Sequence, residues 1–135
     1  MRQPRAQTIQ IKRSETEEQI AVADYLNLLG LCFAHIPNEG KRTPVTAAIL
    51  KRMGMKPGFP DLLILEPRGK YHGLAIEMKS LKGRASADQK EWLKRLHEKG
   101  YATALCFGAD AAIQVINKYR SLGDRALGEY HDEQS

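Results

Sequence analysis

The sequence predicts an α/β fold in which helices flank a mixed central β-sheet. Capping residues and glycines divide the chain into segments in the order α-β-α-β-β-α-β-α. Two apolar segments are joined by the short turn "PRGKYH", which is typical of a β-hairpin, while helical patterns separate the other strands. With 135 residues, the chain has the length of one ordinary domain.

The helices are predicted from their ends. Ser14 and Glu17 have the spacing of a capping box, and Ser86 and Gln89 repeat it before another helical pattern. Thr43 is placed as the N-cap of a further helix because a proline follows it directly. The four predicted helices span residues 14–30, 43–54, 86–100 and 109–123.

Apolar runs of strand length predict the sheet and complete the domain. The predicted strands span residues 31–36, 61–66, 73–80 and 101–108. Residues 14–123 thus form a single domain, between a flexible basic N-terminus (1–13) and a polar C-terminal tail (124–135). Trp92 falls in the apolar stripe of its helix and is expected in the core. No apolar run approaches the about 20 residues of a membrane span, so we expect a cytoplasmic protein.

The charge balance favours a nucleic-acid partner. Twenty-one basic and 16 acidic residues give a net charge of +5, which suits the neutralisation of phosphates. Cys32 and Cys106 lack the spacing of a zinc site and are expected as buried free thiols. The candidates for contacts with the DNA backbone, which could also be only the solvated end of a helix, are Lys41, Arg42, Lys51, Arg52, Lys82 and Arg84.

Three charged residues stand in the predicted hairpin, where apolar residues are the rule. Side chains at i and i+2 of a strand point the same way, so Glu77 and Lys79 share one face. Asp61 opens the preceding strand after a turn that contains Gly58 and Pro60. Because the start of one hairpin strand lies beside the end of its partner, Asp61 and Glu77 are expected to meet at one end of the sheet.

Two adjacent carboxylates repel each other unless a positive charge lies between them. A hard divalent cation, Mg²⁺ or Mn²⁺, fits such a pair of oxygen ligands. A lysine beside it can orient or activate the attacking water and offset the charge of a phosphorane, which is the equipment of phosphodiester hydrolysis. Taken singly, a Pro-Asp pair is more often a turn and an E-x-K pair a surface salt bridge.

A third carboxylate is predicted from the first helix. At 100° per residue, Glu18 lies at the head of the apolar face, while Glu17 already has a role in the capping box. Glu18 is therefore the preferred site residue and Glu15 the alternative. For Gln89, the capping box and a contact with the site stay open as alternatives, and His35 is left out of the metal site.

The stretches "GFPDLLIL", "LAIEMK" and "SADQKEWL" resemble the PD-(D/E)xK nuclease superfamily, and nearly the whole chain is similar to the small stand-alone phage and bacterial form of its VRR-NUC family. This resemblance implies a restriction-endonuclease-like core in which Asp61 and Glu77 bind the metal and Lys79 is the catalytic lysine. It also implies Glu18 as the helix ligand, Gln89 near the site, and a homodimer acting on four-way junctions.

The expected function is that of a metal-dependent DNA endonuclease specific for branched DNA, such as a Holliday junction or a flap. Glu18, Asp61, Glu77 and the carbonyl of Met78 are the expected ligands of Mg²⁺ or Mn²⁺, and Lys79 and Gln89 complete the expected site. Two alternatives remain, a sequence-specific restriction-type nuclease and a non-catalytic nucleic-acid-binding module of the same fold.

Overall fold

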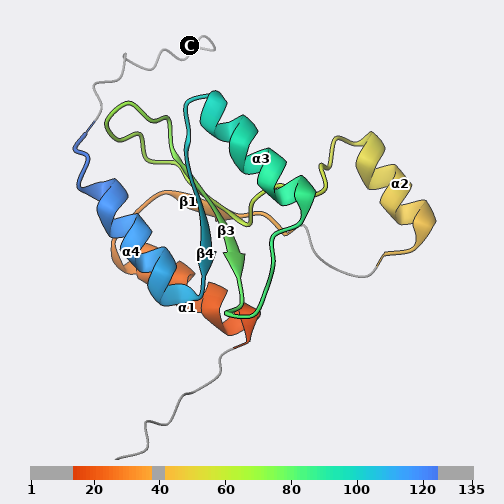
Figure 1. Cartoon of the computed structure of the whole chain (residues 1–135), viewed down its shortest axis with the longest axis horizontal. Coiled ribbons are helices and arrows are strands. Elements are labelled where there is room, and N and C mark those ends of the chain that lie inside the picture. The colour runs from red at the N-terminus through yellow and green to blue at the C-terminus, as the bar shows by residue number, and fades with distance from the viewer. Residues whose placement is uncertain (1–13, 38–41, 125–135) are drawn as a thin grey trace, which may run out of the picture.

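The computed structural model describes residues 14–37 and 42–124, and it confirms the predicted α/β fold and the order of its elements (Figure 1). The predicted N-terminus, most of the predicted tail and Lys41 lie outside the described residues. The helices are α1 (Glu15–Leu28), α2 (Pro44–Arg52), α3 (Ala87–Glu98) and α4 (Ala109–Arg120). The strands are β1 (Phe33–His35), β2 (Leu62–Ile64), β3 (Leu74–Lys79) and β4 (Ala102–Phe107).

The helices begin where the capping residues predict. The Oγ of Ser14 accepts a hydrogen bond from the backbone N–H of Glu17 at 3.2 Å, and α1 starts directly after Ser14. Thr43 caps α2 through its own side chain. At α3 both halves of the capping box form, because Ser86 Oγ accepts from the N–H of Gln89 while Gln89 Oε1 accepts from the N–H of Ser86.

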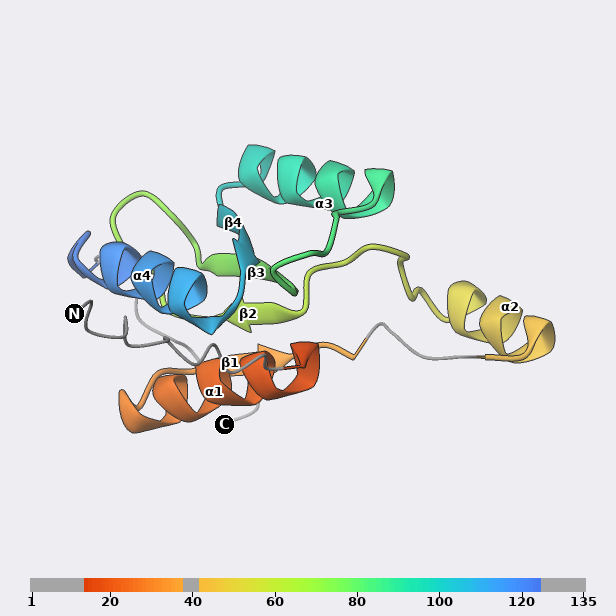
Figure 2. The same cartoon turned by 60° about the horizontal axis from the view of Figure 1, so that its bottom comes forward.

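The four strands form one mixed sheet in the order β1-β2-β3-β4 (Figure 2). β1 and β3 both run antiparallel to β2, whereas β4 runs parallel to β3 because α3 carries the chain back between them. The pairing of β2 with β3 is the predicted hairpin, and it aligns Leu62 with Ile76 and Ile64 with Leu74. β3 therefore has a neighbour on each side.

The core lies on one face of the sheet. Val22 and Leu26 of α1 and Ile116 of α4 pack in one buried cluster with Ile76 and Met78 of β3. Because side chains alternate along a strand, the residues between these two point to the opposite face. α3 covers that face, packing on β3 and β4. The sheet thus separates an apolar layer from the layer in which the charged residues of β3 lie.

Two expectations about buried residues are wrong. Trp92 is only half-buried on α3 and lies outside the core cluster. Its ring packs edge-to-face on Phe59 of the loop before β2, with ring centroids 5.1 Å apart. Of the two thiols, Cys106 is buried, but Cys32 is exposed because it precedes β1 at the edge of the sheet.

α2 stands apart from the rest of the domain (Figures 1 and 2). None of its residues is buried, and Val45, Ile49 and Met53 expose 71%, 52% and 76% of their surface. Nowhere in residues 14–37 and 42–124 is a helix long and apolar enough to cross a lipid bilayer.

Candidate functional site

Asp61 and Glu77 come together across the β2–β3 hairpin. The register ends where Leu62 pairs with Ile76, and Asp61 directly precedes Leu62 as Glu77 directly follows Ile76. Both carboxylates are buried, since Asp61 exposes 5% of its surface and Glu77 exposes 1%. Asp61 Oδ2 accepts a hydrogen bond from the backbone N–H of Met78 at 2.8 Å, so this side chain takes the place of the strand partner that β2 no longer supplies.

Two further side chains converge on Glu77. The ammonium of Lys79 lies 3.5 Å from Glu77 Oε1, and the same oxygen accepts a hydrogen bond from Gln89 Nε2 at 2.7 Å. The side chain of Lys79 is only 12% exposed, so water solvates its charge poorly. Because a charge in a poorly solvated site acts more strongly than one in water, this lysine interacts strongly with the Glu77 carboxylate.

Gln89 has both of the roles between which the sequence could not decide. Its Oε1 accepts the N–H of Ser86 at 2.8 Å as part of the capping box, and its Nε2 donates to Glu77. The two ends of an amide have opposite hydrogen-bonding character. Capping the helix with the oxygen therefore leaves the NH₂ group to face the carboxylate.

The loop before Asp61 is pressed against the first turn of α3. Gly58 has φ +81°, and a Cβ placed on it would lie 2.6 Å from the backbone carbon of Asp88, so only glycine fits there. The carbonyl of Asp61 accepts the N–H of Ile36 at 2.7 Å, and His35 Nδ1 lies 3.0 Å from the same oxygen. His35 also contacts the amide of Gln19. His35 therefore lies beside the site and contacts the backbone carbonyl of Asp61.

The side chain of Glu18, a residue of α1, reaches the start of α4. Its Oε2 accepts the N–H of Ala109 at 2.5 Å, where a carboxylate benefits from the helix dipole. The N–H of the adjacent Gly108 donates to the carbonyl of Lys79 at 2.9 Å, so Glu18 is near the end of β3 at which the site lies. Within residues 14–37 and 42–124, no three His, Cys, Asp or Glu side chains lie close enough to hold a metal ion. The structure therefore brings Lys79 and Gln89 into contact with Glu77 and places Asp61 on the backbone of the next residue, Met78. Glu18 of α1 is bound to the first turn of α4.

The donor set fits a hard divalent cation. Asp61 and Glu77 offer only oxygen atoms, which Mg²⁺ and Mn²⁺ prefer. The carbonyl of Met78 adds another oxygen, because in an extended strand it points to the same side as the N–H that binds Asp61. These three groups are the ones that would hold the metal.

The predicted DNA-binding residues fall into two places. Lys82 and Arg84 are exposed in the loop between β3 and α3, directly after Lys79. Lys51 and Arg52 lie in the last turn of α2, and Arg42 precedes that helix, where its guanidinium donates to the sulfur of Met55. The first group borders the carboxylate pair, whereas the second extends away from the body of the domain.

Sequence reasoning missed a pocket between α3 and the loop that leads into β2. Phe59 and Trp92 line it, together with Ile36, Met55 and Lys56. The signal was present in the sequence, since Phe59 precedes Asp61 by two residues and Trp92 follows Gln89 by one helical turn. The pocket was not predicted because Trp92 falls in an apolar stripe and was therefore expected in the core.

Burial alters one titratable group of the core. Desolvation raises the pKa of the Cys106 thiol from 9.0 to about 11. The thiol is therefore protonated at neutral pH and is a poor nucleophile and a poor metal ligand. It takes no part in the chemistry of the site.

Comparison with known proteins identifies the family. The VRR-NUC domain matches residues 13–110 of the chain. A solved structure titled "VRR_NUC domain protein" superposes with a TM-score of 0.73 at 35% sequence identity, over 85% of this chain and 94% of that one. None of the curated proteins matches. The match spans β1, the Asp61–Glu77 hairpin and α3, and the chain therefore belongs to the VRR-NUC family of nucleases.

Proposed function

We propose that this nuclease is a Mg²⁺- or Mn²⁺-dependent DNA endonuclease that prefers branched DNA, a Holliday junction or a flap. The observation that carries the proposal is the buried pair of carboxylates, Asp61 and Glu77, with the ammonium of Lys79 3.5 Å from one of them. Burying two carboxylates side by side costs free energy unless a cation compensates them. Lys79 supplies one positive charge for the two carboxylates, so a further cation would compensate the second.

The side chains of the site divide the work of phosphodiester hydrolysis. Asp61, Glu77 and the Met78 carbonyl would hold the metal, which when bound would polarise the phosphoryl group and lower the pKa of bound water. Lys79 orients the attacking water and offsets the negative charge that develops on the phosphorane. Gln89 holds the Glu77 carboxylate in position through its 2.7 Å hydrogen bond. We propose Glu18 as a further metal ligand, which requires its carboxylate to leave the N–H of Ala109 that it accepts in this structure.

The basic loop after β3 supplies the first contacts with the DNA backbone. Lys82 and Arg84 are exposed and follow Lys79 closely, so they can neutralise phosphates next to the cleaved bond. Arg42, Lys51 and Arg52 form a second basic group at the two ends of α2, and Lys41 precedes Arg42 in the sequence. Substituting one of these residues by alanine should weaken binding to all DNAs about equally and reduce its salt dependence.

A homodimer would place two such sites on one branched substrate. The support for it is α2, a helix of nine residues without a buried side chain, because isolated helices of that length are marginal in water. Its exposed apolar stripe, Val45, Ile49 and Met53, can be covered by the same stripe of a second copy. Ile49→Asp should then convert the dimer into a monomer in sedimentation analysis, while Thr46→Asp on the same helix should not. A wild-type protein that sediments as a monomer contradicts this part of the proposal.

Cleavage of matched DNAs tests the proposed activity. Labelled four-way junction, flap and linear duplex of common sequence are incubated with the protein in Mn²⁺, Mg²⁺ or EDTA. We expect metal-dependent cleavage with preference for the branched forms, reduced at least about 100-fold in Asp61→Asn and Lys79→Gln. Asp24→Asn and Lys90→Gln change exposed residues of α1 and α3 and serve as matched controls.

The same assay separates the alternatives. Cleavage of linear duplex at one fixed sequence would indicate a restriction-type nuclease. DNA binding without cleavage under every metal condition would indicate a binding module that keeps the fold. Full activity in both Asp61→Asn and Lys79→Gln, with circular dichroism confirming folded proteins, would reject the site itself.

A further inference from the structure

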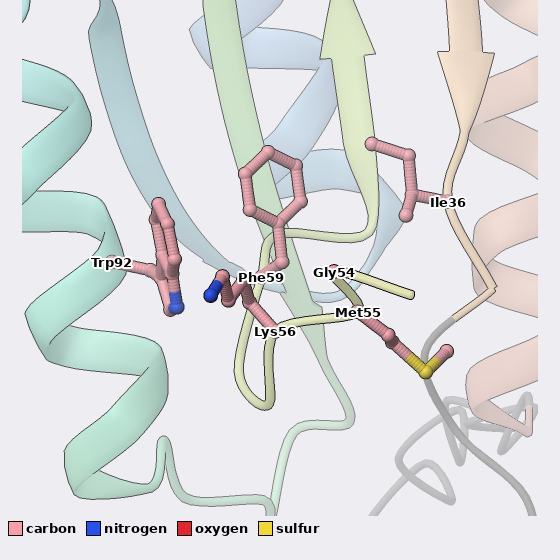
Figure 3. Close-up of a pocket in the computed structure, with 6 residues that line it drawn as sticks. All are labelled: Ile36, Gly54, Met55, Lys56, Phe59 and Trp92. Carbon is pink, nitrogen blue, oxygen red and sulfur yellow. The ribbon is translucent and has the colours of Figure 1, made fainter. Parts of the chain in front are cut away.

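A pocket of about 280 Å³ opens between α3 and the loop that leads into β2 (Figure 3). The ring of Phe59 stands between Trp92 on one side and Ile36 on the other, and Met55 and Lys56 lie below it. Apart from the end of Lys56, the side chains that line it are apolar or aromatic. This is the lining expected for a planar apolar ligand and is unlike that of a phosphate site.

The pocket and the candidate site share their supporting elements. Phe59 and Asp61 lie on the same short segment, which Gly58 fixes against the first turn of α3. Trp92 lies one helical turn after Gln89 and so projects from the same side of α3. A ligand in the pocket therefore contacts the same loop that carries Asp61 and the same helix that carries Gln89.

Positive charge surrounds the aromatic rings. The guanidinium of Arg95 lies 5.0 Å from the centre of the Trp92 ring, as in a cation–π contact. Lys56 is exposed at the edge of the pocket. Aromatic faces bordered by Lys and Arg are the usual receptor for an unstacked nucleobase attached to its phosphates.

We propose that this pocket takes one unpaired nucleobase of the DNA strand being cut. The inference rests on the proposed nuclease function and adds the feature of the substrate that is read. The volume lies just below the about 300–1,000 Å³ of sites for drug-sized ligands, which suits a single ring system. In an intact duplex every base is stacked and paired, so a base must be unstacked before it can enter the pocket, and this costs free energy. At a flap or a branch point the bases are already unpaired, and this cost is smaller. Preference for branched DNA thus follows from the lining of the pocket.

Trp92 makes the proposal directly measurable, because it is the single tryptophan of the sequence. The wild-type protein is titrated in EDTA, so that no cleavage occurs, with three DNAs of equal length and charge. These are a forked DNA with unpaired arms, the same fork with abasic residues in the arms, and a blunt duplex. We expect Trp92 fluorescence to change on binding the fork, and to stay constant on binding the abasic fork or the duplex. Fluorescence anisotropy of labelled DNA gives the affinity of each complex.

Phe59→Leu removes the aromatic face while keeping most of the apolar volume. It should weaken binding of the fork by about tenfold and leave the abasic fork and the duplex unchanged. Phe33→Leu, a phenylalanine packed on the core, is the matched control and should bind like the wild type. Equal fluorescence changes with the normal and abasic forks, or equal affinities in Phe59→Leu, overturn the base pocket and leave the nuclease assignment intact. A protein that binds none of the three DNAs contradicts the proposed function itself, and the pocket with it.

Discussion

Gly58 provides the sharpest test of how the site is held, because the chain contains a matched control. Gly58 and Gly123 have the same φ of +81°, but a Cβ meets nothing within 4 Å at Gly123, whereas at Gly58 it lies 2.6 Å from Asp88. In both positions alanine must adopt a left-handed conformation, which costs about 1–2 kcal/mol. At Gly58 the contact is with backbone, which cannot rotate away, and overpacking adds about 1–3 kcal/mol.

Urea denaturation of the two alanine variants measures the difference. For a slope of about 2 kcal/mol per M, the extra cost places the midpoint of Gly58→Ala about 0.5–1.5 M below that of Gly123→Ala. In the absence of urea, Gly58→Ala should also have lost cleavage activity, because the loop that carries Asp61 has moved away from α3. Equal midpoints for the two variants would show that the loop does not depend on this close approach, and the account of how Asp61 is placed would fail.

The remaining predictions concern single side chains. Gln89→Ala should lower cleavage by about 10–100-fold, as expected for a residue that positions a metal ligand, and steady-state kinetics should show the loss in kcat. Glu18→Ala should destabilise the fold by about 1 kcal/mol in urea, because the first N–H of α4 loses its acceptor. The Cys106 thiol has a pKa of about 11 in the folded protein and 9.0 in the unfolded chain, so as the pH rises it ionises first in the unfolded chain. The free energy of unfolding is therefore unaffected below pH 9.0 and falls as the pH rises from 9.0 towards 11. The fall amounts to at most about 3 kcal/mol, at about 1.4 kcal/mol per pKa unit. It should disappear in Cys106→Ala and persist in Cys32→Ala; equal pH profiles in the two variants would refute the raised pKa.

Local sequence signals predicted the elements and the centre of the site. Capping residues set the starts of α1, α2 and α3 because they satisfy backbone N–H groups within one turn, and that information lies in four consecutive residues. The approach of Asp61 to Glu77 is also local, since a hairpin register follows from its turn. For these features, neighbours in sequence are neighbours in space.

Contacts between distant segments could not be predicted in the same way. The angle of Glu18 on its helix shows that it faces the domain, but not that its partner is Ala109, 91 residues away. Trp92 belongs to an apolar stripe, and a stripe does not state whether the surface opposite it is a filled core or an open pocket. α2 has good caps at both ends, yet nothing in its sequence says that the rest of the chain leaves it uncovered.

The double role of the Gln89 amide makes one backbone proton a reporter of the site. The N–H of Ser86 is protected from exchange with solvent only while Gln89 Oε1 accepts it, and that same amide group holds Glu77. Any event that rotates this side chain, including the arrival of a cation or a phosphate at the carboxylates, therefore also changes hydrogen exchange at Ser86. Amide exchange at a helix terminus can thus follow the occupancy of the proposed site without a label or a substrate turnover.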